Sequence, residues 1–226
     1  MHLHLFSTPG RDGDLRYVLD ACRPYLENKP EVSVAYLPAA SLSNQYQEYT
    51  QRAFSGLVCI QTLDTELQTL PEMEAILRSA ALVFIPGGNT YLLNHRLHLC
   101  KLADVLQRRV ANGLPLVAFS AGAVLCGPNI LTSNDLNIIP TSHFKGLAAL
   151  PFNLNVHYPL DRAARLVRDD WLNEYHTFQD NPVLLLSDGA YVRVEGKRAT
   201  LVRGEAWILR KGQEKQELTE GQTILS

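Results

Sequence analysis

One serine of this chain stands where its hydroxyl could act as a nucleophile. Ser120 follows an apolar run at residues 115–119 (PLVAF), and small residues come directly after it, at 121–123 (AGA). A buried strand that ends on a serine before a helix of small residues is typical of a nucleophile elbow, whose tight turn exposes the hydroxyl beside free N–H groups. The full pattern is Gly-x-Ser-x-Gly, and Ala118 replaces its first glycine. Taken alone, the motif is better interpreted as a helix N-cap.

A second glycine-rich turn strengthens the elbow interpretation. The apolar run at residues 81–85 (ALVFI) leads directly into residues 86–90 (PGGNT). Two glycines at the carboxyl end of a strand permit positive φ and close backbone approach, so N–H groups can point toward a ligand. Open α/β sheets place their sites at such loops. A Gly-Gly pair by itself usually marks a plain turn, but beside Ser120 it could supply half of an oxyanion hole.

A base and a carboxylate could complete this chemistry. His157 lies at the carboxyl end of an alternating stretch, residues 152–158 (FNLNVHY), which predicts a strand. There it could take the proton of a serine, although such a histidine is otherwise an ordinary surface residue, and His143 is the fallback. Asp135 lies just past the elbow, and Asp188 follows another apolar run. Either aspartate could orient the imidazole, and either is alternatively a turn residue.

Three arginines follow the candidate base. The helix predicted over residues 161–174 carries Arg162, Arg165 and Arg168 on one side. Arginines at this spacing usually form a solvated face. One of them, if it lies near the site, could instead bind a substrate carboxylate.

Strands and helices alternate along the first part of the chain, which predicts a doubly wound, mostly parallel α/β sheet. The expected strands cover residues 2–6, 32–38, 57–63, 81–85 and 115–119, and the expected helices cover 12–27, 41–55, 70–80 and 96–110. A C-terminal antiparallel meander is expected from the short strands at 183–187, 191–194, 199–202, 206–209 and 223–225. A length of 226 residues with 46% hydrophobic composition suits one α/β domain over residues 1–226.

The charge and the cysteines narrow the function classes. The formal net charge is −2 with both signs interspersed, which gives no footprint for nucleic acid or an anionic membrane, so we expect a small ligand. The four cysteines are widely spaced without a Cys-x-x-Cys pair, which argues against a zinc site or a dense disulfide framework and predicts buried thiols in a reducing compartment. We expect no metal or organic cofactor. Scattered surface leucines do not decide whether the chain forms a homodimer, which stays a hypothesis.

Two features bear on location. The N-terminus lacks the basic leader and the long apolar region of a signal peptide, so a cytoplasmic protein is expected. Residues 111–134 carry no charge over a length that could cross a bilayer. Prolines, asparagines and glycines interrupt this stretch, and a buried strand with an elbow is expected instead.

Five motifs together resemble the peptidase E family of cytoplasmic aspartyl dipeptidases, which is related to the cyanophycinases. They occur in the order and approximate spacing of that family, cover nearly the whole chain, and lie at residues 84–90 (FIPGGNT), 118–123 (AFSAGA), 132–135 (TSND), 155–158 (NVHY) and 187–189 (SDG). The resemblance implies a fold similar to the class I glutamine amidotransferase-like α/β sandwich, with serine in the place of the cysteine nucleophile.

The resemblance also implies roles for individual residues. Ser120 matches the family nucleophile, His157 matches its base, and the oxyanion-hole positions are matched by Gly88 and Ala121. The third triad member stays open between two residues: Asp135 matches an aspartate assigned to the charge relay, and Asp188 matches a later carboxylate that is often glutamate.

The implied activity is hydrolysis of dipeptides with an N-terminal Asp, through an acyl-enzyme on Ser120. The family selects that Asp with a basic side chain on the helix after the histidine, and Arg162 is the best match. Asn89 is a further candidate for substrate binding. Two alternatives are a related serine hydrolase for isoaspartyl or non-acidic peptides, and a non-catalytic ligand-binding protein on the same scaffold.

Overall fold

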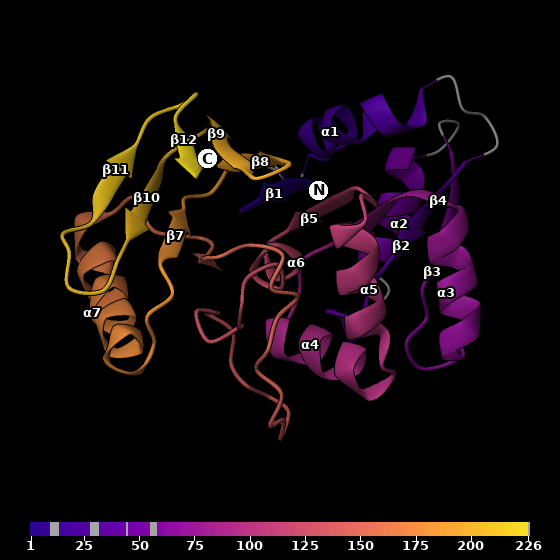
Figure 1. Ribbon diagram of the computed structural model, residues 1–226, viewed down its shortest axis with the longest axis horizontal. Helices are drawn as coiled ribbons and strands as arrows, with labels where there is room; N and C mark the ends of the chain where they lie inside the picture. The colour runs from indigo at the N-terminus through magenta and orange to yellow at the C-terminus, as the bar shows by residue number, and fades with distance from the viewer. Residues whose placement is uncertain (10–13, 28–31, 44, 55–57, 226) are drawn as a thin grey trace.

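The computed structural model describes residues 1–9, 14–27, 32–43, 45–54 and 58–225, and an eight-stranded sheet forms its centre (Figure 1). The strand order is β12-β9-β8-β1-β5-β4-β2-β3. The parallel strands are β1 (His2–Phe6), β5 (Leu116–Phe119), β4 (Ala80–Ile85), β2 (Ser33–Tyr36) and β3 (Cys59–Thr62). Beyond β1, the sheet continues with antiparallel β8 (Tyr191–Glu195), β9 (Arg198–Arg203) and β12 (Thr223–Leu225).

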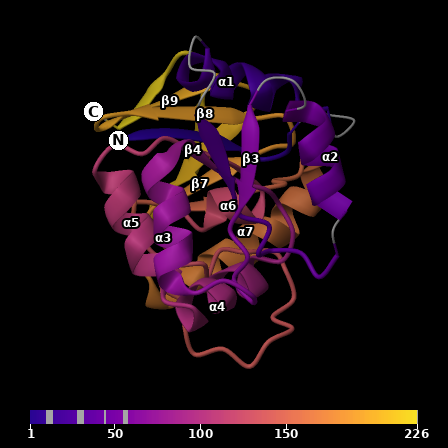
Figure 2. The ribbon, with the colours of Figure 1, turned by 90° about the vertical axis from the view of Figure 1, so that its right-hand side faces the viewer.

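Helices cover both faces of this sheet, as the predicted doubly wound fold requires (Figure 2). One face packs against α1 (Arg16–Leu26) and α2 (Gln45–Phe54), and the other against α3 (Leu70–Ser79), α4 (Thr90–Leu99) and α5 (Leu102–Ala111). Strand β4 is apolar throughout because both of its faces are covered. Phe84 joins the core beneath α1 and α2, whereas Val83 and Ile85 join the core on the opposite face.

A second sheet of four strands, in the order β11-β10-β7-β6, lies beside the first (Figure 1). It contains β6 (Asn153–Asn155), β7 (Val183–Leu186), β10 (Ala206–Leu209) and β11 (Gln216–Leu218), and α7 (Arg162–Phe178) covers its outer face. Successive side chains of β7 point to opposite faces of the second sheet. Val183 and Leu185 pack toward α7, and Leu184 and Leu186 enter the core shared with the large sheet.

The antiparallel strands predicted at the C-terminus are present, and they divide between the two sheets. Strands β8, β9 and β12 extend the large sheet. Strand β10 pairs with β7 in the second sheet, and β11, which was not predicted, pairs with β10. The chain crosses from β9 to β10 at Gly204, where φ is 86° and a Cβ would lie 2.7 Å from Ala190 Cα. Only glycine fits this crossing without strain.

The prediction of a single helix over residues 96–110 is wrong. Two helices occupy this region, because Lys101 adopts a left-handed conformation with φ 61° between α4 and α5. The break lets both Leu97 and Leu102 be fully buried. The helix expected over residues 12–27 begins at Arg16, and residues 12 and 13 lie outside the described part. None of the described helices is long and apolar enough to cross a bilayer.

Candidate active site

Ser120 occupies a sharp turn between β5 and the short helix α6 (Ala121–Val124). Its backbone has φ 52° and ψ −118°, a strained conformation for a residue with a side chain. A Cβ on Gly122 would lie 2.5 Å from the carbonyl oxygen of Ile85, so glycine is needed for α6 to return this close to β4. The methyl group of Ala118 is buried within β5, so the missing first glycine is tolerated. This is the geometry of a nucleophile elbow.

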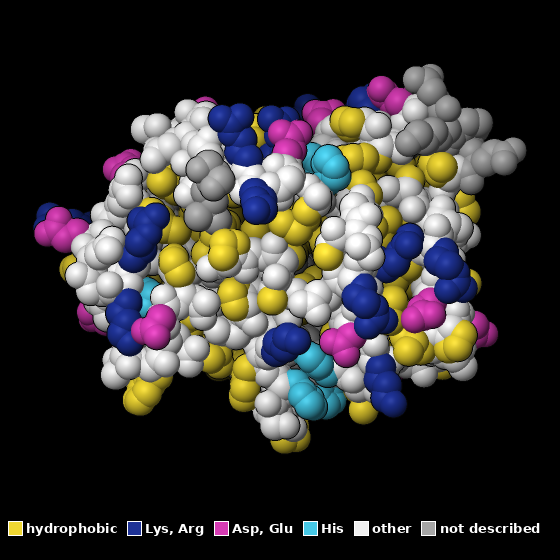
Figure 3. Space-filling view, viewed as in Figure 1, with side chains coloured by type: hydrophobic (Ala, Val, Ile, Leu, Met, Phe, Trp, Pro, Cys, Tyr) yellow, Lys and Arg dark blue, Asp and Glu magenta, His cyan; other side chains and the backbone are white. Residues whose placement is uncertain are grey.

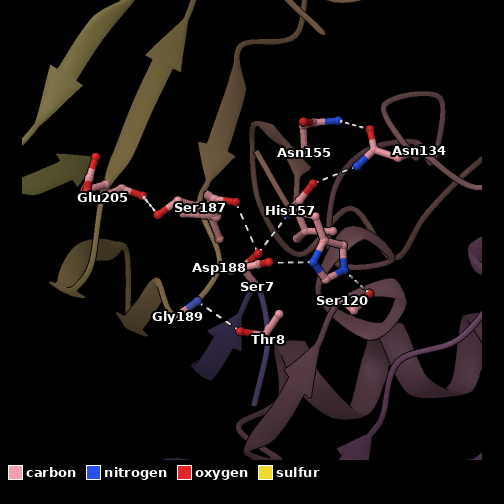
Figure 4. Close-up of polar contacts among 12 residues, drawn as sticks. Ser7, Thr8, Ser120, Asn134, Asn155, His157, Ser187, Asp188, Gly189 and Glu205 are labelled. Carbon is pink, nitrogen blue, oxygen red and sulfur yellow. Dashed lines mark hydrogen bonds and ion pairs between the residues drawn. The ribbon is translucent and has the colours of Figure 1, made fainter. Parts of the chain in front are cut away.

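The imidazole of His157 lies between Ser120 and Asp188 (Figure 4). Ser120 Oγ is 2.9 Å from His157 Nε2, and His157 Nδ1 is 2.7 Å from Asp188 Oδ1. A neutral imidazole has one donor and one acceptor nitrogen. Because the Asp188 carboxylate only accepts, the proton belongs on Nδ1, and Nε2 is left to accept the hydrogen bond from the serine hydroxyl. The short Asp188 side chain is long enough to reach the ring.

Two residues just after β1, Ser7 and Thr8, form hydrogen bonds with the backbone of His157 and of the Asp188 turn. The Ser7 hydroxyl accepts from the His157 backbone N–H over 2.8 Å and donates to the Leu186 carbonyl over 3.1 Å. Thr8 Oγ1 accepts from the backbone N–H of Gly189, over 2.9 Å (Figure 4). Neither residue was predicted from the sequence. The available signal was that polar residues follow the first strand at its carboxyl end, where sites gather in parallel sheets.

The side chains of His157 and Asp188 are open to solvent, and Ser120 is partly exposed. The side chain of His157 is 41% exposed and that of Asp188 is 63% exposed. Asp188 also lines a surface cleft of about 370 Å³, together with Tyr17 and Arg203. A peptide can therefore reach the hydroxyl and the imidazole from solvent.

The Gly-Gly turn passes directly beside the nucleophile. A Cβ on Gly87 would lie 3.0 Å from Ser120 Cβ, and one on Gly88, where φ is 138°, would lie 2.3 Å from the Ala40 carbonyl oxygen. Ala121 is the first residue of α6, so its N–H has no partner inside the helix. Among the described residues, neither the Gly88 N–H nor the Ala121 N–H donates to a protein acceptor. Both are free to bind a ligand oxygen.

Asp135 and Asp188 have different partners. Asp135 Oδ2 accepts from the backbone N–H of Thr90 over 2.7 Å, from the Thr90 hydroxyl over 2.6 Å and from the Ser133 hydroxyl over 3.0 Å. The carboxylate on His157 Nδ1 is that of Asp188. The structure therefore brings Asp188 to the imidazole, and it brings Asp135 to the start of α4.

The predicted substrate-binding residues differ in how they are engaged. Asn89 caps α4 by accepting from the Leu92 N–H over 3.0 Å, and its amide donates to the Leu136 carbonyl over 2.9 Å. Arg162 is the first residue of α7, and its side chain is exposed, with no protein partner in the described structure.

The other two arginines of α7 are partly buried and do not form the expected solvated face. The Arg165 guanidinium stacks 4.3 Å above the Trp207 ring and donates to the Pro159 carbonyl over 2.8 Å. Arg168 Nη1 lies 3.1 Å from Asn155 Oδ1, on the strand that leads to His157. Both side chains lie over the second sheet because α7 packs on that sheet.

The cysteines and other metal-ligating residues form no cluster in the described ranges. No group of three or more His, Cys, Asp or Glu side chains there is arranged to hold a metal ion. All four cysteines are free thiols, but the prediction that all are buried is wrong, because Cys59 is exposed and Cys100 is only partly buried. Burial raises the pKa of Cys126 to about 12. This thiol is unreactive near neutral pH.

Comparison with known proteins decides the family. Residues 5–202 match the model described as Peptidase family S51. The chain belongs to peptidase family S51. A Peptidase E from Nostoc sp. is 30% identical to this S51 chain over 189 residues, covering 81% of the chain and 78% of the relative. A Peptidase E from Streptomyces coelicolor is 30% identical over 214 residues, covering 89% and 88%.

Two further relatives of the S51 chain extend the comparison. A Drosophila melanogaster protein named "Probable alpha-aspartyl dipeptidase" is 39% identical over 142 residues, covering 60% of the chain and 59% of that protein. The crystal structure of a peptidase from an acI-B1 Actinobacterium has the same fold, with a TM-score of 0.74 at 18% identity, covering 100% of this chain and 96% of that one. The S51 chain is thus a peptidase, as its sequence predicted.

Proposed function

We propose that Ser120, His157 and Asp188 form the catalytic triad of this peptidase. The observation that carries the proposal is the unbroken chain of contacts from the hydroxyl through the imidazole to the carboxylate, over 2.9 Å and 2.7 Å. A serine hydroxyl is a weak nucleophile at neutral pH unless a base removes its proton. By accepting from Nδ1–H, Asp188 keeps the tautomer whose Nε2 can do so.

The proposed reaction is acyl transfer to water. Ser120 Oγ attacks the peptide carbonyl carbon while His157 Nε2 takes the hydroxyl proton, and the N–H groups of Gly88 and Ala121 hold the oxyanion. The imidazolium then protonates the leaving amine as the C–N bond breaks, which leaves an ester on the serine. A water molecule, deprotonated by the same imidazole, hydrolyses that ester and restores the hydroxyl. Each step uses only groups of this chain and water.

The proposed substrate is a dipeptide with an N-terminal aspartate. The names of the relatives support this substrate, and so do the arginines of the helix that follows the base. Arg162 stays the predicted partner of the substrate carboxylate, since its guanidinium is exposed and unpaired in the described structure. Arg168 is a second candidate, because its Nη1 lies 3.5 Å from the carbonyl oxygen of Val156, next to the base.

Covalent labelling tests the nucleophile. A fluorophosphonate should label the wild-type protein at Ser120 and leave Ser120→Ala unlabelled, because the reagent forms a bond only with an activated serine. His157→Ala should label much more slowly. Ser79→Ala is the matched control and should label like the wild type, because Ser79 is exposed and its hydroxyl bonds only to carbonyls of its own helix, α3. An unlabelled wild type, under conditions where a control serine hydrolase reacts, would instead favour a non-catalytic binding protein.

A substrate panel tests the specificity. Asp-X dipeptides should have the highest kcat/KM, ahead of isoaspartyl dipeptides and of Asn-X dipeptides, which keep the shape but lack the charge. Arg162→Gln and Arg168→Gln separate the two candidates. The variant that lacks the arginine bound to the substrate carboxylate should lose the preference for Asp-X over Asn-X, and the other variant should keep it. Faster turnover of non-acidic peptides by the wild type would replace the aspartyl proposal with a broader aminopeptidase.

We also propose a cytoplasmic location and a small peptide as the partner, without nucleic acid. Four free thiols suit a reducing compartment. Basic and acidic side chains are interspersed on the face seen in Figure 3, which suits a small ligand better than a polyanion. A homodimer stays a hypothesis, to be tested by sedimentation at several protein concentrations.

A further inference from the structure

We propose that Asp135 is a positioning residue for the oxyanion loop, defined here as residues 86–90, and does not act through His157. This inference rests on the proposed function, because it assumes that the Gly88 N–H holds the oxyanion. It gives a role to an aspartate of the TSND motif that the triad leaves unused.

The contacts of Asp135 converge on one residue of the loop. Its Oδ2 accepts both the backbone N–H and the hydroxyl of Thr90, over 2.7 Å and 2.6 Å. Thr90 is 1% exposed and begins α4, two residues after Gly88. Hydrogen bonds to a charged acceptor are stronger than neutral ones, and a carboxylate at a helix N-terminus is favourable. Burial, together with the Asp135 charge, raises the pKa of Tyr91, the next residue of α4.

Neighbouring contacts fix the loop from two other directions. The Asn89 amide donates to the Leu136 carbonyl over 2.9 Å, which adds a second tie to the Asp135 segment. On the opposite side, the Asn89 backbone N–H donates to the Ala40 carbonyl over 2.8 Å. Gly88 is therefore held between two chain segments while Gly87 packs against Ser120. The direction of the Gly88 N–H depends on both ties.

The same segment is bound to the strand that carries the base. Thr132 Oγ1 donates to the Leu154 carbonyl over 2.7 Å, and the Asn134 amide donates to the Val156 carbonyl over 2.6 Å (Figure 4). Asp135 follows directly and reaches the oxyanion loop. Residues 132–136 thus bridge strand β6 and the oxyanion loop, so that the amide donor and the imidazole keep a fixed relation.

The first test compares Asp135→Asn with Asp188→Asn. We expect Asp135→Asn to lower kcat by about tenfold to a hundredfold with little change in KM, since one oxyanion donor is misplaced. Its affinity for an aspartyl aldehyde, which forms a tetrahedral adduct on serine, should fall by a similar factor. The acid limb of the kcat/KM profile and the downfield NMR signal of His157 Nδ1–H should stay unchanged, whereas Asp188→Asn should alter both.

Asp64→Asn is the matched control. Asp64 also accepts backbone N–H groups, those of Glu66 and Leu67 over 2.9 Å and 3.0 Å, in a turn outside the site. A loss of aldehyde affinity in Asp135→Asn but not in Asp64→Asn separates positioning from general loosening of the fold.

Thr90→Val provides an independent variant that removes one donor to Asp135. It should also lower kcat, and the double variant with Asp135→Asn should lose less than the sum of the two single losses, because both act on one contact. If Asp135→Asn fails to fold, Thr90→Val, which removes the hydroxyl donor to Asp135, is compared with Thr90→Ser, which keeps it. An unchanged aldehyde affinity, or a shifted acid limb, in an otherwise active enzyme overturns the positioning role. A wild type without turnover or labelling overturns the proposed function itself.

Discussion

The hydroxyl of Ser7 accepts a hydrogen bond from the backbone N–H of His157, over 2.8 Å. His157 has φ 54°, a conformation that costs a residue with a side chain about 1–3 kcal/mol and persists only where the surroundings enforce it. Ser7 is fully buried and also donates to the Leu186 carbonyl, so one small side chain joins the end of β1 to the turn of the base and to β7.

Replacing Ser7 should therefore impair catalysis without touching the substrate. Ser7→Ala leaves the buried N–H of His157 without its acceptor, a loss of about 1–3 kcal/mol, and we expect kcat/KM to fall about tenfold. Steady-state kinetics on an Asp-X dipeptide measures this. Ser33→Ala is the control, because Ser33 is also buried but its hydroxyl has no partner in the described structure. Equal losses in the two variants would contradict the anchoring role.

The contact of Asp188 with the imidazole leads to a second prediction. Asp188→Asn should lower kcat/KM by about a hundredfold or more, because an amide can present a donor to Nδ1 and stabilise the wrong tautomer. The measurement is the pH profile of kcat/KM with an Asp-X dipeptide. Asp180→Asn is the control, since Asp180 is a highly exposed aspartate paired with Lys211. Near-wild-type activity in Asp188→Asn would argue against a triad that includes this residue.

The sharp turn at Ser120 could be predicted from sequence because an elbow is a local structure. Strand, serine and small-residue helix are consecutive, and the oxyanion glycines follow the neighbouring strand β4. Pattern and spacing are then sufficient to place Ser120 and Gly88 at one edge of the sheet. The alternating stretch at residues 152–158 made His157 a candidate base, and the resemblance to a family supported it; the observed strand β6 is shorter and ends two residues before His157.

The choice between Asp135 and Asp188 could not be made from sequence. Both follow polar turn patterns, and which one reaches the ring depends on how the second sheet sits beside the first. Ser7 was hidden for a related reason, since its partner is 150 positions away in the chain. The helix break at Lys101 was also missed. The apolar periodicity of the sequence continues across the break, but burial of Leu97 and Leu102 in the tertiary structure overrides that local pattern.

A partly buried polar cluster between α7 and the second sheet yields a third prediction, on stability. Tyr158 donates to Asp169 over 2.6 Å, and Lys215 contacts both, so the residue after the base is tied to α7 and to the hairpin between β10 and β11. Asp169→Ala removes the acceptor that Tyr158 and Lys215 share and should lower the free energy of unfolding by about 1–3 kcal/mol. Urea unfolding measures the change.

The exposed pair of Lys211 and Asp180 serves as the comparison for that cluster. Its contact is 2.7 Å long, but the Asp180 side chain is 87% exposed. Lys211→Met should therefore leave the free energy of unfolding close to the wild-type value, because exposed ion pairs contribute little. Comparable effects in Asp169→Ala and Lys211→Met would show that the partly buried cluster adds little.

His4 makes the fold sensitive to acid. Its ring lies in β1 between the hydroxyls of Tyr191 and Tyr25, 2.6 Å and 2.9 Å away. Burial, and then the positive charges of Arg193 and His2, lower its pKa from 6.5 to about 4. Above pH 6.5 neither the folded nor the unfolded chain protonates this residue, so it imposes no penalty there.

As the pH falls below 6.5, the unfolded chain binds a proton at His4 that the folded chain refuses until about pH 4. The free energy of unfolding should therefore decline across this window, by up to about 3 kcal/mol from this residue. In His4→Gln that contribution to the slope should vanish, while stability at neutral pH falls because the tyrosine contacts are perturbed. Urea unfolding at several pH values measures both effects. His143→Gln removes an exposed histidine and should keep the wild-type slope, so an equal flattening in both variants would mean that His4 is not the group responsible.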